Sequence, residues 1–209
     1  MKSHDCKNGF IYVKSDDGRT AMRRCLVCVE ERFTRAIGRE GTSWETWQHV
    51  EELATQVHVL KNWQGGQWSV CLHAADGKSN FGSGKTHALT ATGVEWIRRG
   101  REVEYRYVPD LVDLHRRALF DSDLRAPALG DSPGLLILDD LGVEARTDWT
   151  TEFIDHLLDQ RYRRRRPTLI ASNLDQAAIA ARYPRIASRL HEGFHLVWSA
   201  PDRRTPTAS

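Results

Sequence analysis

One short segment contains residue types at a spacing that could bind the phosphates of a nucleotide: Ser79, Asn80, Phe81, Gly82, Ser83, Gly84, Lys85 and Thr86. An apolar run precedes this segment, and a helix-forming run follows it. In that context, backbone N–H groups and a helix N-terminus point at phosphate oxygens. Lys85 would reach the β- and γ-phosphates, and Thr86 would offer its hydroxyl to Mg²⁺. The segment therefore predicts a phosphate-binding loop (P-loop) for ATP.

The first position of this loop departs from the usual pattern. It is normally glycine, but here it is Ser79, and Gly77 lies two residues too early to replace it. Serine is compatible with the loop if its φ is negative, because Gly82 and Gly84 still let the backbone approach the phosphates. The alternative is a chance Gly-Ser-Gly-Lys-Thr in an ordinary loop. The strand before it and the helix after it argue against that alternative.

Two carboxylates follow a short apolar segment further along the chain. Leu135–Leu138 predicts a buried strand, and Asp139 and Asp140 come directly after it, at the edge where open α/β sheets bind ligands. We expect Asp139 to hold Mg²⁺, directly or through water. We expect Asp140 to orient or deprotonate an attacking water. A strand that merely ends in an acidic turn is the alternative, and the P-loop upstream makes it the weaker one.

A histidine and three cysteines near the N-terminus have the spacing of a metal site. His4-x-Cys6 and Cys25-x-x-Cys28 are separated by eighteen residues, and two close pairs of ligands suit tetrahedral Zn²⁺. Cytosolic proteins seldom use such a cluster for disulfides. We predict Zn²⁺ bound by all four residues. Alternatively, His4 is an ordinary terminal residue, and Asp5 or water completes the shell.

The residues between the two ligand pairs favour a hairpin. Phe10–Lys14 alternates in polarity, residues 16–18 form an Asp-Asp-Gly turn signal, and Thr20–Arg24 can return. Residues 1–33 are therefore predicted to form a small zinc ribbon or knuckle. Cys71 lies in an apolar run instead, and we expect it to be a small buried hydrophobic residue.

The segments that must position these residues alternate between strand and helix from Gln67 onward. The predicted strands cover residues 68–74, 102–108, 135–138, 167–172 and 194–198. The predicted helices cover residues 86–99, 109–120, 148–165, 175–182 and 185–192. Strands separated by helices predict an α/β fold with a doubly wound parallel sheet over residues 67–209. Residues 34–66 are expected to be a linker with a helix over 45–60.

Composition constrains the class of protein. Hydrophobic residues make up 40% of the chain, enough for a core, and the formal net charge is only +2. Bulk charge therefore does not indicate a nucleic-acid binder, and any basic surface must be local. Residues 1–10 lack the apolar segment of a signal peptide, and no run approaches the roughly 20 apolar residues of a membrane helix. We expect a cytoplasmic protein with no membrane association.

Several motifs, in order along the chain, carry a family resemblance. They are Leu-Asp-Asp-Leu-Gly at 138–142, Thr-Asp-Trp at 147–149, Asp-Gln-Arg-Tyr at 159–162, Pro-Thr-Leu-Ile-Ala-Ser-Asn-Leu at 167–174 and Arg-Ile-Ala-Ser-Arg-Leu at 185–190. With the P-loop, they resemble the DnaC/DnaI-type replicative helicase loaders, which are AAA+ ATPases related to the transposition helper IstB. The resemblance runs from about Trp44 to Arg204. It implies a P-loop (AAA+) domain that carries a small N-terminal zinc-binding module.

The resemblance implies roles for residues that pattern alone does not assign. Asn173 is similar to sensor 1, which polarises the water or reads the γ-phosphate; otherwise it is an Asn in a turn. Arg189 is similar to the arginine finger that acts on ATP bound by a neighbouring subunit. Arg185 competes for that role, and a surface helix arginine is the plain alternative for Arg189. Arg203 or Arg204 is similar to a sensor 2 that contacts the nucleotide.

The resemblance also implies partners and a function. A finger in trans requires a homo-oligomer or co-assembly with a hexameric helicase. The implied function is ATP-dependent loading of the replicative DNA helicase onto single-stranded DNA, with residues 1–33 contacting the helicase. The alternatives are an IstB-type transposition helper and a non-hydrolysing AAA+ adaptor, for which Ser79 is the only hint. The cofactors would be ATP, Mg²⁺ and Zn²⁺.

The densest basic run is Arg161-Tyr-Arg-Arg-Arg-Arg166. It could contact a phosphate backbone. A structural role is favoured, because arginines at a helix C-terminus interact well with the helix dipole and Arg161-Tyr162 belongs to the family pattern. Arg116 and Arg117 are a second candidate for DNA contact, on the helical element that lines a single-strand channel in the proteins this chain resembles.

Overall fold

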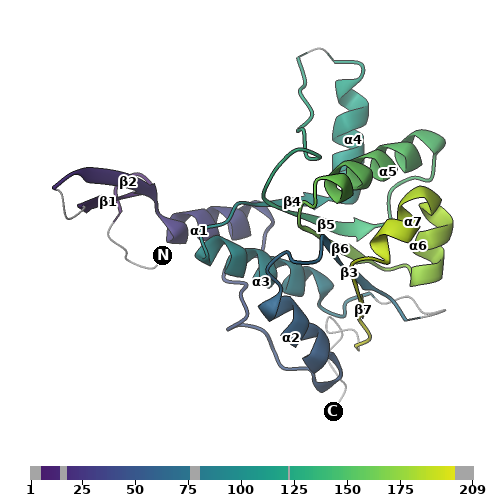
Figure 1. Cartoon of the computed structure of the whole chain (residues 1–209), viewed down its shortest axis with the longest axis horizontal. Coiled ribbons are helices and arrows are strands. Elements are labelled where there is room, and N and C mark those ends of the chain that lie inside the picture. Colours follow the sequence, from purple (N-terminus) through teal and green to yellow (C-terminus); the bar gives the residue numbers. More distant parts are fainter. Residues whose placement is uncertain (1–5, 15–17, 76–80, 122, 201–209) are drawn as a thin grey trace.

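The computed structural model describes residues 6–14, 18–75, 81–121 and 123–200 (Figure 1). At its centre is a sheet of five parallel strands, which lie side by side in the order β4 (Val103–Tyr107), β5 (Leu135–Leu141), β6 (Thr168–Ser172), β3 (Ser69–His73) and β7 (Phe194–Val197). The predicted α/β fold with a doubly wound parallel sheet is confirmed. Because all five strands are parallel, their carboxyl ends meet at one edge.

Helices cover both faces of the sheet (Figure 1). One face packs against α1 (Leu26–Ala36), α2 (Ala54–Asn62) and α3 (Lys85–Arg98). The other face packs against α4 (Val108–Ala118), α5 (Asp148–Arg163), α6 (Gln176–Arg182) and α7 (Pro184–Leu190). Strand residues alternate between the two cores: Val70 and Leu72 lie in the first core, and Cys71 in the second. Cys71 is buried, as predicted.

The N-terminal part contains the predicted hairpin and an additional helix. Strands β1 (Phe10–Lys14) and β2 (Thr20–Arg24) pair antiparallel and project away from the sheet (Figure 1). Helix α1 then runs across residue 33, where the predicted module ends, and packs on α3. Gly93 of α3 allows this approach, because a Cβ there would lie 2.7 Å from the Phe33 ring.

The helix expected over residues 45–60 is shorter than predicted. A 3₁₀ turn, η1 (Glu51–Leu53), precedes α2, and residues 45–50 are not helical. A turn before them explains the difference, because the Thr46 hydroxyl accepts the Ser43 N–H and donates to the Gly41 carbonyl. The indoles of Trp44 and Trp47 also pack edge to face, and both contact the core. No helix in the described part of the chain is long and apolar enough to cross a membrane.

Arg161 is buried in the second layer and holds a loop against the sheet. Its side chain is 0% exposed. Its guanidinium donates hydrogen bonds to Thr168 Oγ1 and to the carbonyl oxygens of Leu129, Ser132, Gly134 and Pro167. Three of the next arginines form surface ion pairs: Arg163 with Asp159, Arg164 with Asp131 and Arg165 with Glu192. These contacts support the structural interpretation of the basic run.

Candidate functional site

An open cavity of about 530 Å³ lies at the carboxyl edge of the sheet. Part of its wall is the P-loop and the first turn of α3: Phe81, Gly82, Ser83, Gly84, Lys85, Thr86 and His87. Residues at or just beyond the carboxyl ends of β4, β5 and β6 line the opposite side: Tyr107, Asp140, Val143 and Asn173. Residues from the segment between α1 and α2 close the cavity: Arg39, Thr46 and Gln48. Predicted residues from distant parts of the chain thus meet around one space.

The described part of the P-loop positions helix α3 toward the cavity. Gly84 is the N-cap of α3 with φ +91°, a left-handed conformation that favours glycine. The helix begins at Lys85, whose side chain is buried and places Nζ 3.4 Å from Ser83 Oγ. The indole of Trp198, after β7, donates to the Ser83 carbonyl at 3.0 Å and fixes the loop from behind. Ser79 and Asn80 lie outside the described residues.

The two oxygen ligands predicted for Mg²⁺ lie together. Thr86 Oγ1 donates to Asp139 Oδ2 at 2.8 Å, and the Tyr105 hydroxyl donates to the same oxygen at 2.7 Å. Burial and the adjacent Asp139 carboxylate raise the pKa of Tyr105, so its hydroxyl stays protonated and remains a donor. A carboxylate beside a hydroxyl is the kind of oxygen pair that Mg²⁺ binds, often with water and substrate phosphates completing the shell. The residues present therefore fit this ion.

Asp140 lies in an unusual backbone position. Strand β5 continues to Leu141, three residues beyond the predicted end at Leu138, and its pairing with β6 is irregular between Leu138 and Leu141. Asp140 has φ +58° at this irregularity. Its Oδ1 accepts a hydrogen bond from Asn173 Nδ2 at 3.0 Å. The predicted water-activating residue and the predicted sensor 1 therefore contact each other beside the cavity.

Arg189 does not line the cavity of its own subunit. It lies on α7, where it forms an ion pair with Asp159 and stacks over the Tyr162 ring, with its guanidinium carbon 5.3 Å from the ring centre. To act as an arginine finger, the Arg189 side chain would have to give up these contacts with α5 and reach the nucleotide of a neighbouring subunit. Arg203 and Arg204 lie outside the described residues.

Several residues at the site were not predicted from the sequence, among them Tyr105, Trp198 and Arg39. Tyr105 lies on a predicted strand and faces Asp139 only because β4 and β5 are neighbours in the sheet. Trp198 was assigned to the last strand, and Arg39 to a linker. No local motif marks either residue, since their places depend on how distant segments pack.

The three N-terminal cysteines converge. The sulfurs of Cys6, Cys25 and Cys28 all lie within 4.8 Å of one another, and Cys6 Sγ is 3.5 Å from Cys28 Sγ. Tetrahedral Zn²⁺ with Zn–S bonds of 2.3 Å needs sulfurs about 3.8 Å apart. Cys25 is the N-cap of α1, and a hydrogen bond from the Cys28 backbone lowers the pKa of Cys25. The cluster fits Zn²⁺, while His4 lies outside the described residues.

Comparisons with known proteins agree with this geometry. A family model described as IstB-like ATP binding protein matches residues 77–183. Two Bacillus subtilis (strain 168) proteins are similar in sequence: the uncharacterized protein YqaM, 34% identical over 119 residues, and the replicative helicase loader DnaI, 33% identical over 95 residues. These matches cover 53% and 44% of this chain. They cover only 37% and 30% of the two relatives, so the chain matches about a third of their length.

Solved structures share the fold. The DnaC helicase loader superimposes with a TM-score of 0.61 at 22% identity, over 76% of this chain and 97% of that one. DnaI gives 0.61 at 23%, over 78% and 91%. The replication initiator DnaA, bound to AMPPCP and single-stranded DNA, gives 0.62 at 22%, over 77% and 50%. The predicted AAA+ fold and the resemblance to this group are confirmed.

Proposed function

The chain belongs to the family of IstB-like ATP-binding proteins, and from this premise we propose that it is an ATPase that loads a replicative DNA helicase onto single-stranded DNA. The observation that carries the ATPase part is the meeting of Lys85, Thr86, Asp139, Asp140 and Asn173 around one cavity. The similarity to DnaI supports the loader part. This role would place the protein in the cytoplasm.

Each residue has a role in the proposed hydrolysis. The Lys85 ammonium pairs with β- and γ-phosphate oxygens, and Thr86 with Asp139 would hold Mg²⁺. Mg²⁺, when bound, neutralises charge on those phosphates. Asp140 accepts a proton from the water that attacks the γ-phosphorus, as the bond from that phosphorus to the β–γ bridging oxygen breaks. Asn173 donates a hydrogen bond to Asp140 Oδ1 and so would orient the carboxylate that activates the water.

We propose that Arg189 completes this site in a neighbouring subunit. In a single subunit its charge is satisfied by Asp159. On assembly into a homo-oligomer or a helicase-bound hexamer, Arg189 would leave the Asp159 carboxylate and pair with the γ-phosphate of ATP bound by the adjacent subunit. Arg189→Ala should then lower kcat without changing ATP affinity. Equal loss of affinity and kcat would contradict a role in trans.

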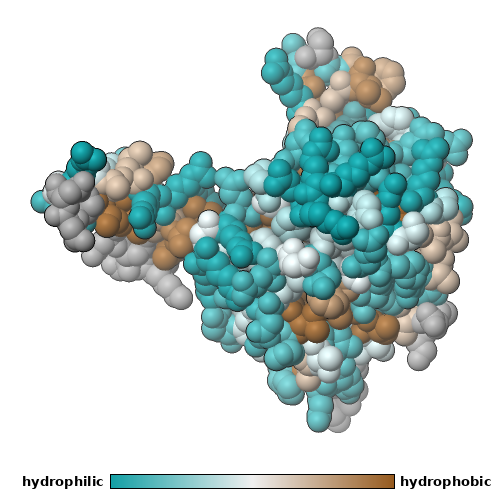
Figure 2. All heavy atoms as spheres, in the orientation of Figure 1, coloured by the Kyte–Doolittle hydropathy of each residue, from teal (hydrophilic) through white to brown (hydrophobic). Residues whose placement is uncertain are grey.

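Two projecting parts of the molecule support the choice of partners. The end of α4 carries Arg116 and Arg117 followed by Leu119 and Phe120, which are 64% and 86% exposed. Figure 2 shows hydrophobic residues on this projection and on the β1–β2 hairpin. An aromatic ring beside arginines suits stacking with bases and pairing with phosphates of single-stranded DNA. We propose DNA contact at the end of α4.

We propose that the hairpin contacts the helicase. Tyr12 and Met22 are 58% and 59% exposed on a two-stranded ribbon that nothing in the described chain covers. Exposed apolar patches of this kind mark protein interaction sites. The cysteine cluster at its base would hold the ribbon in shape.

Reciprocal variants test this division of roles. Tyr12→Ser combined with Met22→Ser should abolish capture of the replicative helicase in a pull-down and leave single-stranded DNA binding intact. Phe120→Ala should weaken DNA binding, measured by fluorescence anisotropy, and leave helicase capture intact. Helicase capture by the hairpin variant at the wild-type level would refute the docking role.

The site itself is tested with nucleotide. Lys85→Ala should abolish ATP binding, and tight binding by this variant would overturn the site assignment. Steady-state ATPase assays with and without single-stranded DNA distinguish an ATPase from a non-hydrolysing adaptor. The family description names IstB, so the second candidate function is that of an IstB-type transposition helper. Capture of a transposase in place of the helicase would support the role of a transposition helper.

A further inference from the structure

Arg39 reaches the candidate nucleotide cavity from outside the AAA+ motifs. Helix α1 ends at Ala36, and two hydrogen bonds then fix the chain: Gly38 N–H to the Arg35 carbonyl at 3.0 Å, and Arg39 N–H to the Thr34 carbonyl at 2.7 Å. Gly38 has φ +62°, as this type of helix end requires. The end of α1 thus positions Arg39 on the cavity wall.

The positive charge of Arg39 lies on the same cavity as Lys85 of the P-loop. Among the described residues that line the cavity, the lysine is Lys85 and the arginine is Arg39. No described carboxylate forms an ion pair with Arg39, whereas Arg35, one turn earlier, approaches Glu40. Arg39 and Lys85 therefore place two positive charges on the wall of one cavity, which Thr86 and Asp140 also line.

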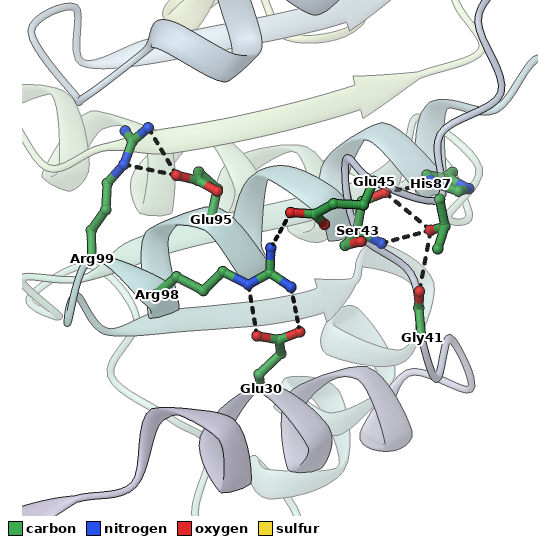
Figure 3. A network of polar contacts seen from close by, with 9 residues as sticks. Glu30, Gly41, Ser43, Glu45, His87, Glu95, Arg98 and Arg99 are labelled. Atoms are coloured by element: carbon green, nitrogen blue, oxygen red, sulfur yellow. Dashed lines mark hydrogen bonds and ion pairs between the residues drawn. The ribbon is translucent and has the colours of Figure 1, made fainter. Parts of the chain in front are cut away.

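Helix α1 connects this residue to the cysteine cluster. Its eleven residues span about 16 Å, with Cys25 as the N-cap at one end and Arg39 just beyond the other. The helix is fixed in its middle, because Arg98 of α3 donates two hydrogen bonds to Glu30, at 2.8 and 2.9 Å (Figure 3). Phe33 packs on Gly93 beside them.

The loop after Arg39 is tied to the same helix. Arg98 Nη1 also binds Glu45 at 2.6 Å, and His87 Nε2 lies 3.2 Å from the Ser43 carbonyl oxygen (Figure 3). His87 directly follows Thr86 in the first turn of α3. A shift of Arg39 toward bound phosphate would therefore also change the contacts that tie α1 and the following loop to α3.

We propose that Arg39 binds the terminal phosphates of the nucleotide in its own subunit, and that α1 thereby links nucleotide binding to the cysteine cluster. This inference rests on the ATP site proposed above. A guanidinium can form two parallel hydrogen bonds to phosphate oxygens. It would supply a second cation, beside Lys85, in a site that also holds two aspartates.

Nucleotide affinity of the full chain, measured by calorimetry with ATP and ADP, tests the contact. Arg39→Ala should weaken ATP binding about tenfold or more, as for loss of charged hydrogen bonds, and ADP binding less. Arg39→Lys should recover part of the loss. Arg35→Ala is the matched control and should change neither affinity. ATP affinity of Arg39→Ala within twofold of this control would overturn the inference.

Lys85→Ala separates this inference from the proposed site. If it binds ATP like the wild type, the ATP site itself is wrong. If it loses ATP binding while Arg39→Ala does not, only the role of Arg39 fails.

Hydrogen exchange at saturating ATP tests the link. In the wild type, ATP should slow exchange across residues 26–39, and this slowing should be absent from Arg39→Ala at a saturating ATP concentration. Equal slowing in both proteins would overturn the transmission through Arg39.

Discussion

The β1–β2 hairpin and the central sheet contain similar short strands but depend on different forces. Strands β3 and β6 are buried along their whole length, between two hydrophobic cores. In the hairpin, every residue except Phe10 is exposed. A two-stranded ribbon without a core is at best marginally stable alone. The contrast indicates that the sheet is held by hydrophobic burial, and it predicts that the hairpin relies on Zn²⁺ bound by its cysteine cluster.

Removal of metal should separate the two regions most clearly. Chelation should unfold the hairpin, because structural Zn²⁺ typically contributes about 10–16 kcal/mol to small modules. The sheet should keep its thermal unfolding transition. Thiol labelling monitors both: Cys6, Cys25 and Cys28 should become reactive. Cys71 should not, since burial raises the pKa of Cys71 to about 12 and blocks access. Labelling of Cys71 on chelation would contradict the expectation that the sheet stays folded without the metal.

Loss of Arg161 should act on the sheet side alone. Arg161→Met leaves buried carbonyl oxygens without donors, at about 1–3 kcal/mol for each such group. We expect the free energy of unfolding to fall by about 4 kcal/mol in denaturant titrations followed by tryptophan fluorescence. The control is Arg163→Met, which removes a surface ion pair and should cost no more than about 1 kcal/mol. Equal effects of the two variants would contradict the structural role of Arg161.

Glu30→Gln should loosen the contact between the two regions. It weakens the pair with Arg98 that joins α1 to α3, and at partial exposure the cost should be about 1 kcal/mol. Faster hydrogen exchange in α1, with little change in the sheet, is the expected result. Glu95→Gln is the control, because Glu95 pairs with Arg99 at the end of α3 and this pair does not join α3 to α1 (Figure 3). An equal increase of hydrogen exchange in Glu95→Gln would contradict the role of Glu30 in joining α1 to α3.

The smallest expected effect concerns the hydrogen bond that joins Trp198, after β7, to the P-loop. Trp198→Phe keeps an aromatic ring but removes the hydrogen bond to the Ser83 carbonyl. A neutral hydrogen bond contributes about 1 kcal/mol, so ATP affinity should fall about fivefold. Trp63→Phe removes an indole hydrogen bond to Gln67 away from the cavity and should leave affinity unchanged. Unchanged affinity in Trp198→Phe would show that the loop holds its shape without this bond.

Sequence patterns predicted the sheet well because its signals are local. Most of the strands are apolar runs between helices with clear ends, and the P-loop and the acidic pair come directly after such runs. Helix α1 was not predicted: Cys25 at its N-cap and Cys28 in its first turn have the spacing of a metal site, although the helix as a whole is amphipathic. Residues 45–50 were predicted helical, but a hydroxyl turn at Thr46 and the packing of Trp47 override their propensity.

The parts of the site that could not be predicted depend on tertiary structure. Asp140 lines the cavity, and its positive φ lies where the pairing between β5 and β6 is irregular, which the sequence of one segment cannot reveal. Arg39 lies on the cavity only because α1 packs on α3 and ends nearby. Arg189 was assigned by resemblance, and its pairing with Asp159 depends on the packing of α7 against α5.

The sheet order has a consequence for synthesis of the protein on the ribosome. Strand β3 leads into the P-loop, but its partners β6 and β7 come late: Val70 pairs with Leu169 and Phe194. At about 5–20 residues per second, β3 would wait roughly 5–25 seconds for its neighbours. During that time a strand that is wholly buried in the folded protein would remain unpaired in the nascent chain. The nucleotide loop is thus translated early but cannot be supported by its sheet until the last strand emerges.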